Sequence, residues 1–168
     1  MRTTTAAAGS AAFLVIAPGT VAGLAPWWLT GWQQGAPYPS PLRAGGTVLL
    51  AIGALALLHA FLRFVIEGTG TPAPAAPTQR LVIGGLYRYV RNPMYLAVLA
   101  VIVGQALLLS QPVLLSYAAA VGAAVGAFAR WHEEPTLARR YGAQYEAYRR
   151  EVPAWWPRRP RSGRKTPG

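Results

Sequence analysis

Residues 92–129 contain no Lys, Arg, Asp, Glu or His. A lipid bilayer is the commonest environment for so long an uncharged apolar stretch. The dipeptide Gln111-Pro112 predicts a tight turn that divides it into two helices, at residues 93–110 and 113–129. Each is long enough to cross the core of a bilayer. We therefore expect an antiparallel membrane hairpin, and a buried hairpin of a soluble protein is the alternative interpretation.

Residues 44–66 form another apolar run, in which His59 and Arg63 are the only ionisable side chains. As a helix this run spans about 35 Å, enough for a bilayer core with some tilt. Arg63 can extend its guanidinium group to the interface. A histidine inside a membrane is a candidate functional residue. Because His59 lies near one end of the run, a packing role is the favoured interpretation.

Residues 11–29 form a further apolar segment, which two prolines interrupt. One arginine followed by a short apolar core is also the general form of a cleaved signal peptide. Trp27, Trp28 and Trp32 instead favour an aromatic belt at the outer end of a membrane span. The prediction is therefore an N-terminal span followed by a short outer loop.

The charge is strongly unbalanced, with sixteen Lys and Arg against five acidic residues and a net charge of +11. Such a charge is typical of nucleic-acid binding. Ten of the sixteen cations, however, follow the last apolar run. Cations that flank membrane spans on the cytoplasmic side are the commoner cause of this pattern. We predict no nucleic-acid partner, and we place both termini and the loop at residues 67–92 on the cytoplasmic side.

Residues 135–150 predict an amphipathic helix on the membrane surface. Pro135 suits the first position of such a helix. We expect residues 152–157, which include two tryptophans, to anchor its end at the interface. The apolar stripe of this helix comprises Leu137, Tyr141, Tyr145 and Tyr148.

These segments predict an all-α integral membrane protein with about four transmembrane helices and a C-terminal amphipathic interfacial helix. Residues 1–42 would form the N-terminal span and the outer loop. Residues 43–157 would form the membrane core, and residues 158–168 a basic disordered tail. The chain has no Cys, so it has no disulfide, no thiolate metal site and no cysteine nucleophile. We expect no bound metal.

Two polar clusters flank the predicted hairpin, and an antiparallel hairpin places its two open ends side by side. Paired acids beside arginines suit a zwitterionic or cationic ligand. The alternative interpretation has about equal weight: arginine and glutamate at the ends of spans are simply solvated interface charges that bind no ligand. The first cluster comprises Tyr87, Arg88, Arg91, Asn92 and Tyr95, and the second comprises Arg130, His132, Glu133 and Glu134.

An ordered series of motifs runs through and beyond these clusters: Gly85-x-Tyr87, Val90-Arg91-Asn92-Pro93-x-Tyr95, Glu133-Glu134, and Tyr141-Gly142-x-x-Tyr145-x-x-Tyr148 followed by Val152-Pro153. The series covers roughly residues 67–157 and resembles the isoprenylcysteine carboxyl methyltransferase and phospholipid methyltransferase superfamily. The resemblance implies a membrane methyltransferase core at residues 43–157. It also implies that S-adenosylmethionine binds on the cytoplasmic side without a Rossmann domain.

The resemblance also implies roles for individual residues. Arg130 is the nearest match to a family arginine that contacts the substrate, offset by one position, and it joins Glu133 and Glu134 as a candidate catalytic residue. Asn92 stands where the family motif usually has His, and an amide cannot titrate. The cofactor contacts implied by position or by charge are Gln79, Arg80, Leu81, Val82, Tyr87, Arg91, Asn92, Pro93, Met94, Tyr95 and Glu133.

Methyl transfer from a sulfonium is an in-line displacement that needs mainly a correct geometry of donor and acceptor. Glu133 or Glu134 can pair with the ammonium or sulfonium of the donor. Arg91 or Arg130 can hold a carboxylate by bidentate contact. An ionised carboxylate acceptor needs no base. An amine acceptor must lose a proton, to Glu133, Glu134 or His132.

The sequence therefore predicts S-adenosylmethionine-dependent methyl transfer to a lipophilic or lipid-linked acceptor in the membrane, most like an isoprenylcysteine-type carboxylate O-methyltransferase. A phospholipid amine N-methyltransferase is the first alternative. A non-catalytic membrane scaffold whose basic tail binds anionic lipids is the second. The sequence specifies neither the acceptor nor the oligomeric state.

Overall fold

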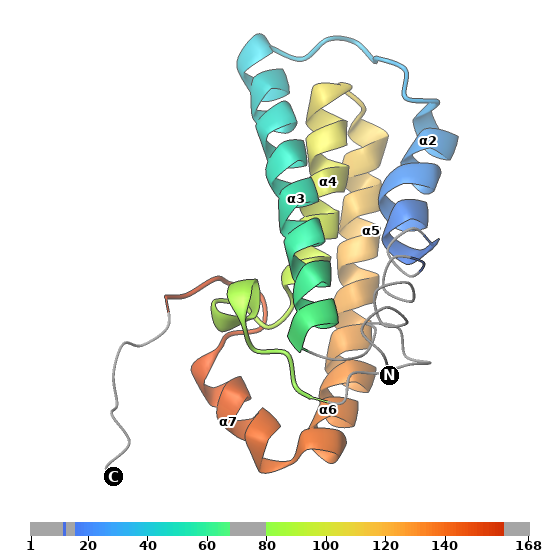
Figure 1. Cartoon of the computed structure of the whole chain (residues 1–168). Helices are drawn as coiled ribbons and strands as arrows, with labels where there is room; N and C mark the ends of the chain where they lie inside the picture. Colours follow the sequence, from blue (N-terminus) through green and yellow to red (C-terminus); the bar gives the residue numbers. More distant parts are fainter. Residues whose placement is uncertain (1–11, 13–15, 68–79, 160–168) are drawn as a thin grey trace.

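The computed structural model describes residue 12 and residues 16–67 and 80–159 (Figure 1). The described ranges are helical and contain no strand, which confirms the all-α prediction. The predictions for residues 1–11, 68–79 and 160–168, Gln79 included, lie outside them. The elements are the π-helix η1 (Thr20–Leu24), α2 (Ala25–Thr30), α3 (Ser40–Glu67), the 3-10 helix η2 (Gly85–Arg88), α4 (Pro93–Leu108), α5 (Pro112–Phe128), the π-helix η3 (Ala129–Glu133), α6 (Glu134–Tyr141) and α7 (Ala143–Glu151).

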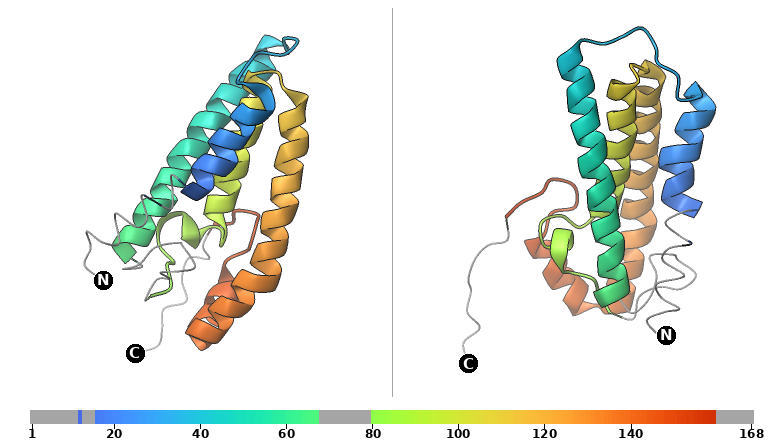
Figure 2. Two further views of the ribbon diagram at one scale, coloured as in Figure 1. Left: turned by 90° about the vertical axis from the view of Figure 1, so that its right-hand side faces the viewer. Right: turned by 45° about the horizontal axis from the view of Figure 1, so that its top comes forward.

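Helices α3, α4 and α5 lie side by side, and α2 packs along α5 (Figures 1 and 2). Ser40–Arg63 and Pro112–Tyr141 are long and apolar enough to cross a membrane, and α4 is apolar but shorter. The number of spans, predicted as four, stays a prediction. We call the end of the bundle at the α4–α5 turn the hairpin end, and the opposite end, where α6 and α7 lie, the polar end.

The α4–α5 hairpin forms as the sequence predicts. Pro93 and Pro112 begin the two helices, where a missing N–H costs no helical hydrogen bond. Ser110 in the turn has φ 55°, and its hydroxyl accepts a hydrogen bond from the Tyr38 N–H at 2.9 Å. The Gly35 N–H donates to the Leu109 carbonyl at 2.9 Å. These contacts connect the hairpin to the loop that precedes α3.

Helices α3 and α4 approach each other closely through glycines. A Cβ atom on Gly104 would lie 2.6 Å from the backbone nitrogen of Leu50. A Cβ atom on Gly46 would lie equally close to the backbone nitrogen of Leu108. Small residues allow such contact between helices in lipid, where dispersion forces replace the hydrophobic effect as the main attraction.

The N-terminal helix is attached to α4 and α5 by side chains that bind its free carbonyl groups. Pro26 has no N–H, so one carbonyl about one turn earlier lacks its helical partner. The Gln105 amide donates to the Ala22 carbonyl at 2.6 Å, and the Tyr117 hydroxyl donates to the Val21 carbonyl at 2.8 Å. Both bonds give a backbone carbonyl of the N-terminal helix a donor from a neighbouring helix, which is favourable in an apolar environment.

The structure corrects two predictions about the C-terminal region. The helix of α5 does not stop at residue 129. It continues through η3 into α6, so that Pro112–Tyr141 forms one continuous helix (Figure 2). The π turn of η3, in which the Glu134 N–H bonds to the Ala129 carbonyl, precedes Pro135 without a break in the helix.

The second correction concerns the amphipathic helix expected at residues 135–150. It is divided at Gly142, whose φ of 51° lies in the left-handed region that favours glycine. The predicted stripe is therefore shared between α6 and α7. The location of these two helices on a membrane surface stays a prediction.

Candidate functional site

The two predicted polar clusters meet at the polar end of the bundle. Tyr95 lies in the first turn of α4, and Glu133 ends η3. The Tyr95 hydroxyl donates a hydrogen bond to Glu133 Oε2 at 2.8 Å. This contact brings together residues 38 positions apart, as the antiparallel hairpin predicts.

The two neighbouring glutamates have different electrostatic surroundings. Glu134 Oε1 pairs with Arg91 at 3.0 Å, and Glu134 Oε2 lies 3.4 Å from Arg130. Within the described ranges, Glu133 makes no ion pair and accepts only the neutral hydrogen bond from Tyr95. Glu133 is therefore the carboxylate with charge available for a cationic ligand.

Arg91 connects α4 to the C-terminal helices. Its Nη2 pairs with Glu134, and its Nη1 donates to the Tyr145 hydroxyl at 3.1 Å. Its Nε is buried and has no hydrogen-bond partner among the residues that the structure describes. The side chain is only 13% exposed. Because removal of one partner leaves a buried charge uncompensated, the Arg91–Glu134 pair fixes α6 relative to the start of α4.

The buried Tyr87 and the half-buried Tyr148 join η2 to α7. The Tyr148 hydroxyl donates to the Tyr87 carbonyl at 2.7 Å. Tyr87 itself lies in an apolar cluster with Ala60 and Val82, against which Met94 packs. Burial raises the pKa of both tyrosines, and their proximity to each other raises the pKa of Tyr87 further. Both phenols therefore remain neutral at physiological pH.

Residues 152–158, which we call the C-terminal strap, run along the segment that leads into α4. The Arg91 N–H donates to the Pro153 carbonyl at 2.9 Å, and the Arg158 N–H donates to the Tyr89 carbonyl at 3.0 Å. The Asn92 side-chain amide donates to the Ala154 carbonyl at 3.2 Å. The Trp155 ring stacks on Tyr95 with centroids 6.3 Å apart.

The sequence predicts a membrane anchor at residues 152–157. It did not predict that this segment forms a strap along the start of α4. The hydrogen bonds of the strap are made largely by the backbone and leave no pattern of side chains in the sequence. Trp156 is 85% exposed, as an interfacial anchor requires, whereas Trp155 is turned inward. Asn92 acts here as a hydrogen-bond donor, a role that needs no titration.

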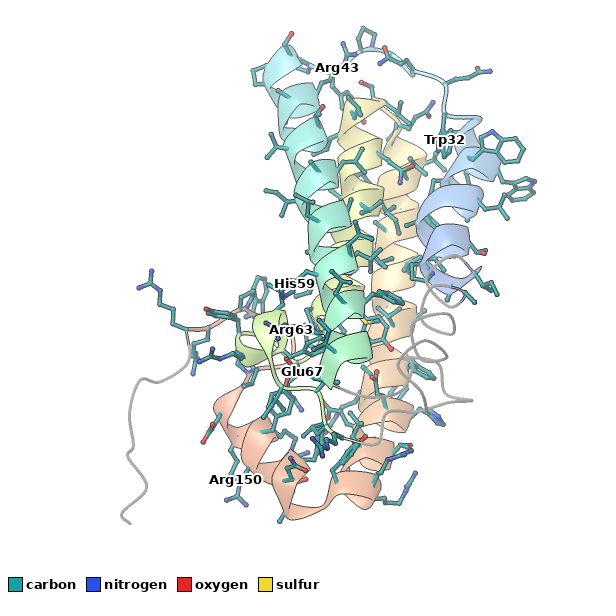
Figure 3. All side chains as sticks on the ribbon, viewed as in Figure 1. Trp32, Arg43, His59, Arg63, Glu67 and Arg150 are labelled. Atoms are coloured by element: carbon teal, nitrogen blue, oxygen red, sulfur yellow. The ribbon has the colours of Figure 1, made fainter. Side chains whose placement is uncertain are left out.

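The end of α3 holds the η2 segment in place (Figure 3). Glu67 accepts a hydrogen bond from the Gly84 N–H at 2.9 Å and pairs with Arg63 at 2.7 Å. Gly85 has φ 57°, and a Cβ atom there would overlap the His59 imidazole. This contact agrees with the packing role favoured for His59. Sequence reasoning did not identify Glu67 as a partner of this segment.

The other predicted site residues take varied positions. Arg80 is exposed, Leu81 is half-buried, and Val82 is buried in the Tyr87 cluster. Pro93 is buried and Met94 half-buried. Arg130 is 71% exposed and therefore accessible to a ligand.

A model of the phospholipid methyltransferase family matches residues 42–144, a range that runs from α3 to the start of α7. Tyr95, Glu133 and Glu134 lie inside the matched range. No curated protein and no solved structure matches the chain.

Proposed function

Because the chain belongs to the phospholipid methyltransferase family, we propose that it transfers a methyl group from S-adenosylmethionine to a lipophilic acceptor at the cytoplasmic side of a membrane. The family supports methyltransferase activity, and the long apolar helices support a membrane location. The identity of the cofactor, the cytoplasmic location of the site and the nature of the acceptor are the proposed parts.

The observation that carries the proposal is the carboxylate of Glu133, which lies beside two aromatic rings and has no ion-pair partner in the described part of the chain. Tyr95 bonds to this carboxylate, and Trp155 stacks on Tyr95. A carboxylate without a cationic partner and the faces of aromatic rings both attract a sulfonium or ammonium group. The residues present therefore fit S-adenosylmethionine, which supplies an electrophilic methyl group on a positively charged sulfur.

The residues around Glu133 have separate tasks in this proposal. Glu133 orients the cationic part of the donor, and Tyr95 positions the carboxylate. Arg130, exposed and engaged by Glu134 through Nη1 alone, holds an anionic group of the acceptor. Arg91 is engaged at both terminal nitrogens, so it is a positioning residue for Glu134 and does not hold a ligand carboxylate.

The acceptor determines whether a base is required. A carboxylate, as in an isoprenylcysteine-type acceptor, attacks the methyl carbon with an oxygen lone pair and releases no proton. This acceptor is our first proposal, since Glu133 already receives a hydrogen bond and Glu134 is ion-paired. The description of the matched family favours the alternative, a phospholipid amine. Its proton would pass to Glu133 or His132.

Binding of S-adenosylmethionine to the purified protein in detergent tests the site. We expect Glu133→Ala to weaken binding at least ten-fold, because a hydrogen bond or ion pair to a charged group contributes about 1.5–3 kcal/mol. Tyr95→Ala should weaken binding in the same direction. Glu146→Ala is the control, since Glu146 forms an exposed pair with Arg149 on α7. Equal binding by all three variants would favour the non-catalytic scaffold.

Membranes incubated with methyl-labelled S-adenosylmethionine identify the acceptor. A methyl ester releases its label as methanol in mild alkali, whereas an N-methyl amine retains it. We expect alkali-labile label in the lipid-soluble fraction. Alkali-stable label in phospholipid would instead establish the amine acceptor.

A further inference from the structure

An open groove of about 500 Å³ lies between α3 and α4, apart from the Tyr95–Glu133 contact. Leu96, Ala97 and Ala100 line it from α4. This spacing defines one face of a helix, and Tyr95 belongs to a different face. The contact of Tyr95 with η3 confirms that the two faces point to different neighbours.

Small side chains form the floor of the groove. Gly53 and Ala56 line it from α3, and a Cβ atom on Gly53 would lie 3.0 Å from the Cβ atom of Ala100. The helices are therefore in contact at the floor, while the larger side chains of Ile52 and Leu96 form part of the walls. The lining from both helices is apolar.

Positive charge is confined to the end of the groove near the C-terminal strap. Arg158 and Arg159 line the groove there together with Tyr89. The hydrogen bond from the Arg158 N–H to the Tyr89 carbonyl holds this segment in position. Both arginine side chains are exposed, and neither forms an ion pair within the described ranges.

We propose that the groove binds one acyl chain of a membrane glycerophospholipid, with the lipid phosphate against Arg158 and Arg159. An apolar groove that faces a bilayer is filled by lipid chains, because an empty groove loses dispersion contacts. Guanidinium groups match phosphate in charge and geometry. The volume lies within the range of roughly 300–1,000 Å³ that is usual for ligand sites.

This lipid is a resident ligand and is distinct from the methyl acceptor. It lies on a different face of α4 from Tyr95, which bonds to Glu133, so its head group is not placed for transfer. It contacts the C-terminal strap, whose Ala154 and Trp155 hold Asn92 and Tyr95. Bound lipid therefore stabilises the strap against the bundle. The inference does not depend on methyltransferase activity.

Native mass spectrometry of the detergent-purified full chain tests the proposal. The probes are phosphatidylglycerol and a diacylglycerol with the same acyl chains and no phosphate. We expect the wild-type chain to bind phosphatidylglycerol at least ten-fold more tightly. Ala56→Phe fills the groove and should reduce this binding at least ten-fold, whereas Ala54→Phe, at an exposed position of the same helix, should not.

A double substitution tests the phosphate contact separately from the packing of the helices. R158Q/R159Q should lower phosphatidylglycerol binding to the diacylglycerol level, and R139Q/R140Q, with the same loss of charge, should leave it unchanged. Equal binding of the two probes by the wild-type chain would overturn the proposal. An equal loss in both double variants would also overturn it, since the effect would then be general surface charge. If Ala56→Phe fails to fold, as thermal unfolding would show, the double variants still decide.

Discussion

Among single residues, Pro26 has the clearest effect beyond its own position. It removes one N–H from the N-terminal helix, and in this part of the helix Gln105 and Tyr117 donate to the carbonyls of Ala22 and Val21. Proline in this segment is visible in the sequence, but the side chains that bond to Ala22 and Val21 lie 83 and 96 positions from those two residues. The sequence pattern therefore identifies the missing N–H but not the side chains that donate to these carbonyls.

Gln105→Leu should destabilise the protein by about 1 kcal/mol, because the buried Ala22 carbonyl loses its donor. Gln111→Leu is the matched control, since its hydrogen bond to the Gln33 carbonyl at 2.9 Å is exposed to solvent. Thermal unfolding in detergent measures both. A smaller loss of stability in Gln105→Leu than in Gln111→Leu would contradict this account.

The glutamate pair shows how far sequence reasoning reaches at the residue scale. The hairpin predicted that Tyr95 and Glu133 would be neighbours, and the structure places them in contact. Sequence treats Glu133 and Glu134 alike, because adjacent residues of one type carry no information on their partners. The separation of roles comes from Arg91, which reaches Glu134 and leaves Glu133 without an ion pair among the residues that the structure describes. The assignment of Glu133 to catalysis or binding stays a proposal.

Among the secondary-structure elements, the hydrophobic runs predicted α3, α4 and α5 well, with ends that differ by a few residues. The continuous helix formed by α5, η3 and α6 was not predicted. Pro135 is equally compatible with the start of a helix and with the turn after a π segment. The strap was also missed, since hydrogen bonds between irregular segments leave no periodic signal.

Alanine substitutions at two glycines test the packing of the helices. We expect them to have different effects on the stability of the protein. Gly104→Ala should destabilise the protein by about 1–3 kcal/mol, because the new methyl group overlaps the backbone of Leu50. Gly126→Ala should be neutral or stabilising by up to about 1 kcal/mol, since open space surrounds it and alanine favours helix. Unfolding in detergent compares the two. Equal effects would show that α3 and α4 are not in close contact.

At the scale of the whole molecule, the absence of cysteine allows a direct test of orientation. Gln34→Cys, beside the α4–α5 turn, and Gln144→Cys, in α7, place a thiol at exposed positions near opposite ends of the bundle. The distribution of arginines predicts that a membrane-impermeant maleimide labels Gln34→Cys in intact cells and Gln144→Cys only after permeabilisation. The reverse pattern would place the polar end outside.

Because the helix that begins at Pro112 is continuous, its length determines the membrane depth at which chemistry can take place. Glu133 lies about 30 Å along this helix from its first residue, a length close to the hydrocarbon thickness of a bilayer. If the hairpin turn rests at one surface, the carboxylate stands at the depth of the opposite head groups. In the proposed reaction, a water-soluble donor and an acceptor anchored by its tail can then meet at this boundary without extraction of the acceptor from the leaflet.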